Sequence, residues 1–441
     1  MSEGVTPHGG LDQDIIEAHP AAGTGRPGDM AIGVIIGRTS EYFDFFVYAI
    51  ASVLVFPRVM FPFEDALTGT LFSFAIFSLA FVARPIGTVI FTAIDRTHGR
   101  SAKLIFALLG LGTSTVAVAF LPSYNQIGWF SPLLLTLCRI GQGVALGGTW
   151  DGLPSLLAIN APANRRGWYA MLPQLGAPLG LIVASGLFSY FIANLPAADF
   201  YEWGWRYPFM VAFSINVVAL FARLRIVVTP EFSGLFKAQS LEASPVGETI
   251  KAERKNIILG TLAPLVAFVL FHMVTVFPLS WLFVFTKQPP ARVLIIELVS
   301  ALVGVAAMLA SGVLADKFGR RRLLGAVAIA IGFYSGFAPQ LLAGGDWGEA
   351  AYMALGFVLL GLSFGQASGT LASNFAVARR YTSSAIVADL SWLFGAGFAP
   401  LVALWMSSKL GLIGSGVYLA SGAVCTLLAL GLNLQSANAE L

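Results

Sequence analysis

Apolar residues fill twelve long runs of the chain, and short polar stretches separate one run from the next. The runs lie near residues 30–57, 66–94, 102–122, 129–160, 167–194, 207–228, 257–285, 293–315, 322–343, 350–376, 383–408 and 413–434. A helix needs about 20 apolar residues to cross a bilayer, and each run is long enough. The pattern therefore predicts an all-α membrane protein with twelve transmembrane helices.

The longest internal polar break divides these runs six and six. It covers residues 229–256 and carries charges of both signs, which indicates a cytoplasmic linker with some amphipathic helix. Two six-helix halves packed around a central path are typical of transporters. The predicted domains are a disordered cytoplasmic tail at 1–29, an N-terminal six-helix bundle at 30–228, the linker at 229–256, a C-terminal six-helix bundle at 257–434 and a cytoplasmic tail at 435–441.

Lysine and arginine are distributed unevenly over the connections between the runs. If the N-terminus is cytoplasmic, the cytoplasmic connections hold seventeen of them, Arg223 included, and the external loops hold five. Because short cytoplasmic loops collect basic residues, we expect both termini to be cytoplasmic and the chain to lie in the cytoplasmic membrane. The first 29 residues lack the basic start and short apolar stretch of a signal peptide.

Composition strengthens the membrane assignment and excludes several function classes. Hydrophobic residues make up 57% of the chain and charged residues 11%, whereas charged residues are about a quarter of a soluble domain. Cys138 and Cys425 lie inside apolar runs and the four histidines are scattered, so no metal site is expected, and His272 is expected to be a packed or pore-lining residue. The sequence has no phosphate-binding glycine-rich loop, no serine-nucleophile signature and no basic patch interleaved with aromatic residues. We therefore expect no enzyme activity, no cofactor and no nucleic acid partner.

The first run carries three ionisable residues, Arg38, Glu41 and Asp44, in otherwise apolar sequence. At about 100° per residue they occupy an arc of about 120° on a helix, and Tyr48 falls within that arc. An ionised group in the middle of a bilayer is costly unless it is paired or hydrated. Such a stripe is therefore expected to face the protein interior and to mark function.

Other ionisable residues are predicted at similar depths in the membrane. Glu41 lies about 16 Å from the cytoplasmic end of its helix, and Arg84, Asp151 and Asp389 lie at comparable levels. We expect these groups to converge on one central cavity that binds substrate and protons. The alternative is that Arg38 with Glu41, and Arg84 with one of the acids, form structural ion pairs.

The loop after the eighth run, "GVLADKFGRRR" at 312–322, combines a small residue, an acid and a turn glycine. Gly312 would let two helices approach closely, Asp316 can pair with a helix N-terminus, and Gly319 permits a tight turn before Arg320. These residues resemble the loop motif of the major facilitator superfamily at the place of its second-half copy. The resemblance implies that the loop latches neighbouring helices on one side of the membrane.

The corresponding first-half loop, "TAIDRTHGR" at 92–100, departs from that motif. When the loop is aligned on Gly99 and Arg100, Thr92 replaces the first glycine. Asp95 comes one position early, and Arg96 stands where aspartate is expected. The departure predicts an altered cytoplasmic latch in the N-terminal half.

Further stretches narrow the resemblance to the metabolite:proton symporter family, a group with a sugar-transporter-like fold. They are "SEYFDFFVY" at 40–48, "ARPIG" at 83–87, "RIGQGVALGG" at 139–148, "PQLGAPLGL" at 173–181, "WGWRYPF" at 203–209 and "GAGFAP" at 395–400. Arg139 with Gln142 resembles a motif linked to proton movement, although an arginine that ties helices together would look the same. Thr149 stands where the family commonly has glutamate. The acids of the first run, with Asp151, therefore become the predicted proton carriers of the N-terminal half.

The resemblance implies a secondary active transporter that moves a small organic anion by alternating access, with proton symport. Its expected partners are the small-molecule substrate, protons and the lipid bilayer, and it is expected to work as a monomer. A facilitative or other-ion-coupled carrier of a zwitterionic metabolite, and a non-transporting membrane sensor, remain alternatives. The candidate substrate- and proton-binding residues are Arg38, Glu41, Asp44, Arg84, Arg139, Asp151, Gln174 and Asp389. The candidate gating residues are Asp95, Arg96, Gly99, Arg100, Gly312, Asp316, Gly319 and Arg320.

Overall fold

The computed structural model describes residues 27–149, 152, 157, 161–228, 242–367 and 375–439, and these residues form helices and connecting turns without any strand. Within the described residues, ten helices are long and apolar enough to cross a membrane. One of them, α4 (Ala66–Ala119), reverses direction at Gly99, where φ is +84°, and so provides two spans. α2 (Pro27–Leu54) adds a further span that carries the three ionisable residues of the first run. The predicted fold with twelve transmembrane helices is confirmed.

Six spans form the N-terminal half. They are α2, the two arms of α4, α6 (Phe130–Gly148), the segment made of α8 (Arg166–Met171), η2 (Leu172–Leu175) and α9 (Gly176–Asn194), and α11 (Tyr207–Val228). The short elements of this half are α3 (Phe56–Val59), α5 (Tyr124–Ile127), η1 (Ala163–Arg165), α10 (Ala197–Glu202) and η3 (Gly204–Arg206).

The C-terminal half supplies the other six spans. α13 (Val246–Leu262) begins in the predicted linker and leads into a seventh span made of α14 (Leu265–Thr275), α15 (Phe277–Trp281) and the π-helical η4 (Leu282–Thr286). The following spans are α16 (Pro290–Phe318), α17 (Arg320–Leu342) and α18 (Gly345–Ala367). After η6 (Val377–Arg379), the chain forms α19 (Arg380–Ser391), the π-helical η7 (Trp392–Gly397), α20 (Ala399–Leu410) and α21 (Ile413–Ala439).

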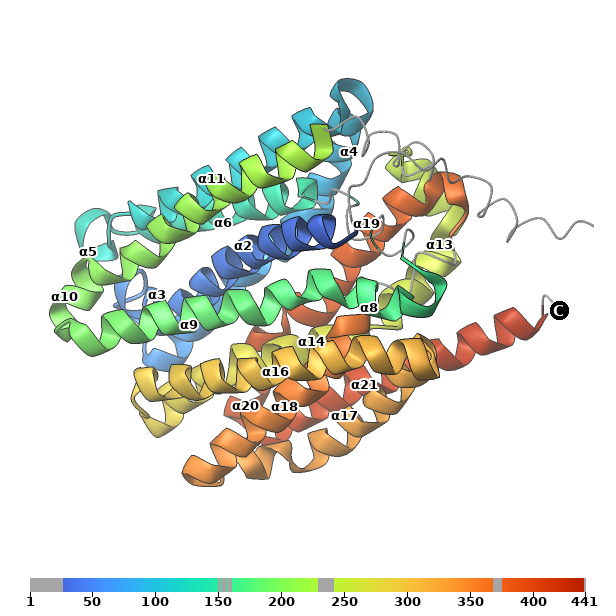
Figure 1. Cartoon of the computed structure of the whole chain (residues 1–441). Coiled ribbons are helices and arrows are strands. Elements are labelled where there is room, and N and C mark those ends of the chain that lie inside the picture. Colours follow the sequence, from blue (N-terminus) through green and yellow to red (C-terminus); the bar gives the residue numbers. More distant parts are fainter. Residues whose placement is uncertain are drawn as a thin grey trace, which may run out of the picture.

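The two halves lie side by side with their helices roughly parallel to one long axis (Figure 1). α3, α5 and α10 gather at one end of the bundle, and the turn of α4, α8 and α13 gather at the other (Figure 1). α2 begins and α21 ends at this second end. An even number of spans places both ends of the described chain on one side.

The halves meet along two seams. In the first, here called the α4–α19 seam, α4 packs against α19 and η7; in the second, the α9–α16 seam, α9 and α8 pack against α16. Between the seams, aromatic rings from both halves fill the centre of the bundle. Phe45 of α2 stacks on His272 of α14 with ring centres 5.4 Å apart, and Tyr42 lies 6.1 Å from Trp392 of η7. His272 is therefore a packed residue, as expected.

Candidate functional site

Asp44 on α2 is held inside the N-terminal half by neutral groups. Thr115 Oγ1 on α4 lies 2.9 and 2.8 Å from the two carboxylate oxygens, and Asn216 Nδ2 on α11 donates to Oδ2 at 3.1 Å. Ser40 Oγ donates to Asn216 Oδ1 at 2.7 Å, which turns the amide nitrogen toward Asp44. Asp44 is 3% exposed, and no basic side chain among the described residues forms an ion pair with it.

A chain of hydrogen bonds links Asp44 to Arg139 on α6. Gln142 Nε2 donates to Thr115 Oγ1 at 2.9 Å, and Gln142 Oε1 accepts from Arg139 Nη1 at 3.0 Å. The Arg139 guanidinium also lies over the Tyr48 ring, with its carbon 4.0 Å from the ring centre. Arg139 thus ties α6 to α2, as the structural interpretation expected, and it also reaches the proposed proton site through two intervening side chains.

Glu41 forms ion pairs with two arginines. Arg38 Nη1, one turn earlier on α2, lies 2.7 Å from Glu41 Oε2, and Arg223 on α11 pairs with Glu41 Oε1. The alternative of an Arg38–Glu41 pair is therefore observed. The assignment of Arg223 to a cytoplasmic connection is wrong, because this residue lies within α11 and is 2% exposed. The Glu41 carboxylate compensates for the free-energy cost of burying the charge of Arg223.

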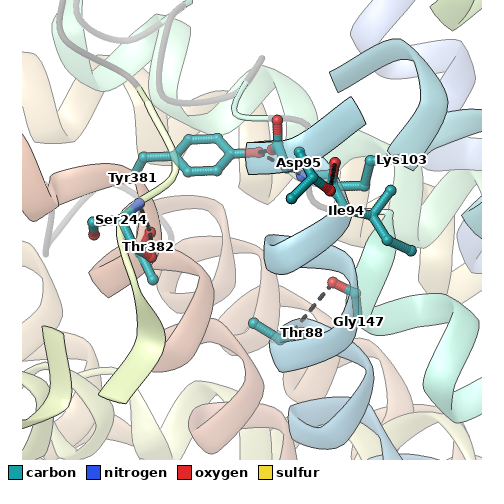
Figure 2. Close-up of polar contacts among 9 residues, drawn as sticks. Thr88, Ile94, Asp95, Lys103, Gly147, Ser244, Tyr381 and Thr382 are labelled. Carbon is teal, nitrogen blue, oxygen red and sulfur yellow. Dashed lines mark hydrogen bonds and ion pairs between the residues drawn. The ribbon is translucent and has the colours of Figure 1, made fainter. Parts of the chain in front are cut away.

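Arg84 on α4 and Asp389 on α19 form an ion pair across the α4–α19 seam. Arg84 Nε lies 2.7 Å from Asp389 Oδ1, although its N–H is not aligned for a hydrogen bond. Thr88, one turn after Arg84, donates to Asp389 Oδ2. Thr88 Oγ1 also lies 3.2 Å from the Gly147 carbonyl oxygen of α6 (Figure 2). The second predicted ion pair is therefore also observed, and it joins the two halves.

Convergence of these groups on one central cavity stays a prediction, and among the described residues they form two separate ion-pair clusters. Glu41 contacts α11, whereas Arg84 contacts α19, so groups at similar depths face different neighbours. Aromatic rings occupy the space between them. One small apolar space near this centre, lined by Phe46, Phe271 and other apolar side chains, is about 10 Å³, enough for roughly one water molecule.

Two candidate residues remain outside this network. Asp151 lies outside the described residues. Gln174 is buried in η2, which packs against α2.

The second-half loop joins α16 to the N-terminal half as its sequence predicts. A side-chain carbon at Gly312 would lie 3.0 Å from Trp168 Cα, which is closer than an ordinary contact, so glycine favours this close approach of α16 and α8. Asp316 Oδ1 accepts from the Gly167 N–H at 2.6 Å, and Oδ2 accepts from the Trp168 N–H at 3.1 Å. The carboxylate therefore caps the start of α8, where helix N–H groups lack intrahelical partners.

The same loop extends this contact through Arg320. Gly319 has φ of +86° and turns the chain from α16 into α17. Arg320 Nε donates to Gln366 Oε1 at 3.1 Å, and Gln366 Nε2 donates to the Gly167 carbonyl oxygen at 3.1 Å. Asp316 and Arg320 thus both act on the start of α8, one directly and one through α18.

The first-half loop also contacts the other half, but through different residues. Lys103 Nζ lies 2.9 Å from Asp95 Oδ2 and 2.6 Å from Tyr381 Oη, and Tyr381 Oη donates to Asp95 at 3.2 Å (Figure 2). The Arg100 guanidinium lies 5.0 Å from the centre of the Tyr381 ring, whereas Arg96 is exposed. Because Tyr381 lies at the start of α19, the altered loop still joins the halves at this end.

Several residues of the network were not identified from the sequence. They are the neutral partners and counter-ions Thr115, Asn216, Arg223, Lys103 and Tyr381. One signal was available, because Asn216 and Arg223 are seven residues apart and so lie on one face of the sixth span. Nothing in the local pattern paired that face with the first span.

Residues 30–258 match the family model described as "Sugar (and other) transporter". The inner membrane metabolite transport protein YhjE of Escherichia coli strain K12 is 37% identical over 90% of this chain and 92% of its own length. The shikimate transporter of the same strain is 28% identical over 89% of this chain and 91% of its own. A D-xylose-proton symporter crystal structure shares the fold, with a TM-score of 0.68 and 17% identity over 91% of this chain and 96% of that one. The chain therefore belongs to the sugar (and other) transporter family, and it is a multi-pass membrane transport protein of the major facilitator superfamily rather than an enzyme.

Proposed function

We propose that the protein is a secondary active transporter that moves a small organic anion together with protons by alternating access. The observation that carries the proposal is the buried Asp44 carboxylate, which has hydrogen-bond donors but no paired cation in the described chain. Because the Thr115 hydroxyl can either donate or accept a hydrogen bond, it suits both the ionised and the neutral carboxyl. Asp44 can therefore take up and release a proton without leaving a buried arginine unpaired.

Glu41 and Asp389 are less suited to this role. Glu41 lies between Arg38 and Arg223, and Asp389 lies against Arg84. Removing one charge of a buried pair is strongly destabilising, since the partner is left uncompensated. These contacts favour Asp44 over Glu41 as the proton carrier. Arg139 is the basic group that a chain of hydrogen bonds connects to Asp44, so a change in the charge of Asp44 would affect it.

Arg84 is the proposed anchor for the anionic group of the substrate. A substrate carboxylate would compete with Asp389 for the guanidinium, which suits the planar geometry of a carboxylate. Displacement of Asp389 would weaken the α4–α19 seam, so substrate arrival would promote its opening. The name of the shikimate transporter, a relative, gives a carboxylate as its substrate, which supports an anion here.

The two loops are the proposed cytoplasmic gate. Asp316, Arg320 and Gly312 hold α16 and α18 against α8, while Asp95 and Arg100 contact the start of α19. We assign both contacts to the cytoplasmic side because basic residues concentrate in these loops. They would keep that side shut while the substrate enters from the other side.

The proposed orientation places both termini and the linker in the cytoplasm. Single cysteines introduced at Glu248 and Asp346, in a chain whose two natural cysteines are replaced, report on it. An impermeant thiol reagent added outside intact cells should label only the position in the connection at Asp346. Labelling of the cysteine at position 248 from outside would contradict the proposed orientation and indicate the opposite one.

The transport proposal is tested in two steps. A thermal-stability screen of small carboxylic acids, shikimate included, first identifies a ligand, because a bound ligand stabilises the folded state. Proteoliposomes then compare wild type with Asp44→Asn. We expect the variant to lose accumulation of that acid driven by a pH gradient and to retain exchange of labelled for unlabelled acid.

A matched control is Asp346→Asn, which removes an exposed acid at the beginning of α18. It should accumulate the acid as wild type does. Accumulation by Asp44→Asn equal to that of wild type would refute Asp44 as the proton carrier. If every variant accumulates the acid with a sodium gradient and no pH gradient, the coupling ion is sodium and not the proton.

A further inference from the structure

Glu297 is a buried acid that the proposed proton and substrate sites do not use. It lies on α16, faces α9 across the α9–α16 seam and is 1% exposed. Ser185 Oγ on α9 lies 3.3 Å from Glu297 Oε2. The other carboxyl oxygen, Oε1, has no hydrogen-bond partner within the described residues. Glu297 therefore joins the two halves through a single hydroxyl group.

The charged groups on the helices around Glu297 are engaged elsewhere or are distant. Arg292, five residues earlier on α16, pairs with Asp346 at 2.7 Å and with Glu349 at 2.8 Å. On α9 the one titratable side chain is Tyr190, which is 62% exposed, and on α18 the Tyr352 hydroxyl donates to a main-chain carbonyl. The remaining charged residues of η1, α8, α16 and α17 lie at the opposite end of α16, about 28 Å along the helix: Arg165, Arg166, Asp316, Lys317, Arg320, Arg321 and Arg322.

This surrounding suits a neutral carboxyl. An ionised carboxylate there would have one hydrogen-bond donor and no counter-ion, and burying a charge under such conditions is costly. A neutral carboxyl has one proton to donate, and the Ser185 oxygen can accept it. The closed seam is therefore compatible with a protonated Glu297, whereas ionisation favours a state in which water reaches the side chain.

Glu297 also lies on the two helices' shared face that leads to the small central space. Gly304 and Met308, two and three turns farther along the same face of α16, line the small central space. Leu181, one turn before Ser185 on α9, lines it from the other half. Glu297 thus stands between the central space and the end of the seam near Pro290.

We propose that Glu297 is a second proton-binding site, whose proton allows the α9–α16 seam to close and whose release opens the seam toward its Pro290 end. The proposal rests on the proposed function only for the relative movement of the two halves. It does not depend on the identity of the substrate or on Asp44.

The test measures the seam without substrate. Spin labels at Asn194 and Ala291 mark the ends of α9 and α16 near Glu297, in purified protein whose natural cysteines are replaced. With rising pH, the distance distribution of the otherwise wild-type protein should shift toward longer distances. Glu297→Gln should abolish that shift and keep the short distances, because glutamine cannot ionise. Tyr190→Phe, a control at the exposed titratable side chain of α9, should retain the shift.

An independent measurement detects the proton itself. The infrared spectrum should contain a carbonyl band of a neutral carboxyl group that disappears on raising the pH and is missing in Glu297→Gln. If the glutamine variant does not fold, Glu297→Asp should keep a titratable band and move the midpoint of the distance change.

Three results would overturn the proposal. They are an unchanged pH-dependent shift in Glu297→Gln, no shift in the otherwise wild-type protein, and a shift that follows sodium concentration at constant pH. Failure of carboxylate uptake would contradict the proposed function but not this site, because neither measurement contains substrate.

Discussion

Apart from Glu349, which pairs with Arg292 inside the C-terminal half, the buried acids named above are placed differently in the two halves of the bundle. The N-terminal half encloses Asp44 and Glu41 in its own interior, where both side chains contact α11 and Asp44 also contacts α4. The C-terminal half instead directs Asp389 and Glu297 to its two seams with the N-terminal half. In the proposed alternating-access cycle, contacts within one half would persist as the halves rock, whereas contacts across a seam would break and re-form. The difference indicates that the N-terminal interior suits proton storage and the seams suit gating.

The largest predicted effect concerns the ion pair at the α4–α19 seam. Arg84→Ala leaves Asp389 buried beside Thr88 alone, and loss of one partner of a buried pair destabilises by about 3 to 5 kcal/mol. Thermal unfolding in detergent should show this loss, and both uptake and exchange should fall. The double variant Arg84→Ala with Asp389→Ala should recover part of the stability. An Arg84→Ala protein as stable as wild type would contradict the importance of the pair in the closed seam.

The next effect separates Glu41 from Asp44 within the N-terminal interior. Glu41→Gln replaces two charged contacts to Arg38 and Arg223 by weaker ones and should cost about 3 kcal/mol of stability. Because the proton site is assigned to Asp44, the protein that folds should still accumulate substrate with a pH gradient. If Glu41→Gln loses accumulation of the substrate but retains its exchange, the proton carrier is Glu41 and not Asp44.

A smaller effect is expected at the second-half loop. Asp316→Asn weakens the cap on α8 and should shift the balance between the outward- and inward-facing states by about 1 to 3 kcal/mol. Transport should slow, and thiol probes placed on the cytoplasmic ends of the helices should react faster. Lys317→Gln, an exposed neighbour on the same turn, should leave both unchanged. Equal thiol reactivity in Asp316→Asn and wild type would show that the loop only turns the chain and does not hold the cytoplasmic side shut.

The smallest effect is expected where the first-half loop contacts α19. Tyr381→Phe removes the hydroxyl that contacts Lys103 and Asp95 but keeps the ring, so the expected loss is about 0.5 to 1.5 kcal/mol of gate stability. The same thiol-reactivity assay should show a modest increase. An effect larger than that of Asp316→Asn would make the first-half loop, despite its altered sequence, the main cytoplasmic latch.

Features that depend on local sequence were predictable. Long apolar runs gave the twelve spans because a bilayer fixes the length of a helix that crosses it. The roles of Gly312 and Gly319 also followed from local chemistry, since close packing and a turn with positive φ both favour glycine. The buried stripe of Arg38, Glu41 and Asp44 followed from helical periodicity and the cost of charge in lipid.

Features that depend on the rotation and pairing of distant helices were not predictable. The depths of Glu41 and Arg84 in the membrane were predictable, but the neighbouring helices that their side chains face were not. One cavity was therefore expected, whereas the described residues form one pair inside the N-terminal half and one pair at the α4–α19 seam. Asp44 was singled out correctly as buried, yet its neutral partners Thr115 and Asn216 are ordinary polar residues in other spans. Only the packing of α2 against α4 and α11 brings them together.

The central claim is that a proton on Asp44 moves with the substrate. It is tested most directly by recording the external pH of weakly buffered proteoliposomes, with the membrane potential clamped, when the identified carboxylic acid is added as its anion. Wild type should make the external medium more alkaline as substrate enters, and Asp44→Asn should exchange substrate without any change in external pH. Alkalinisation by Asp44→Asn equal to that of wild type would contradict the claim.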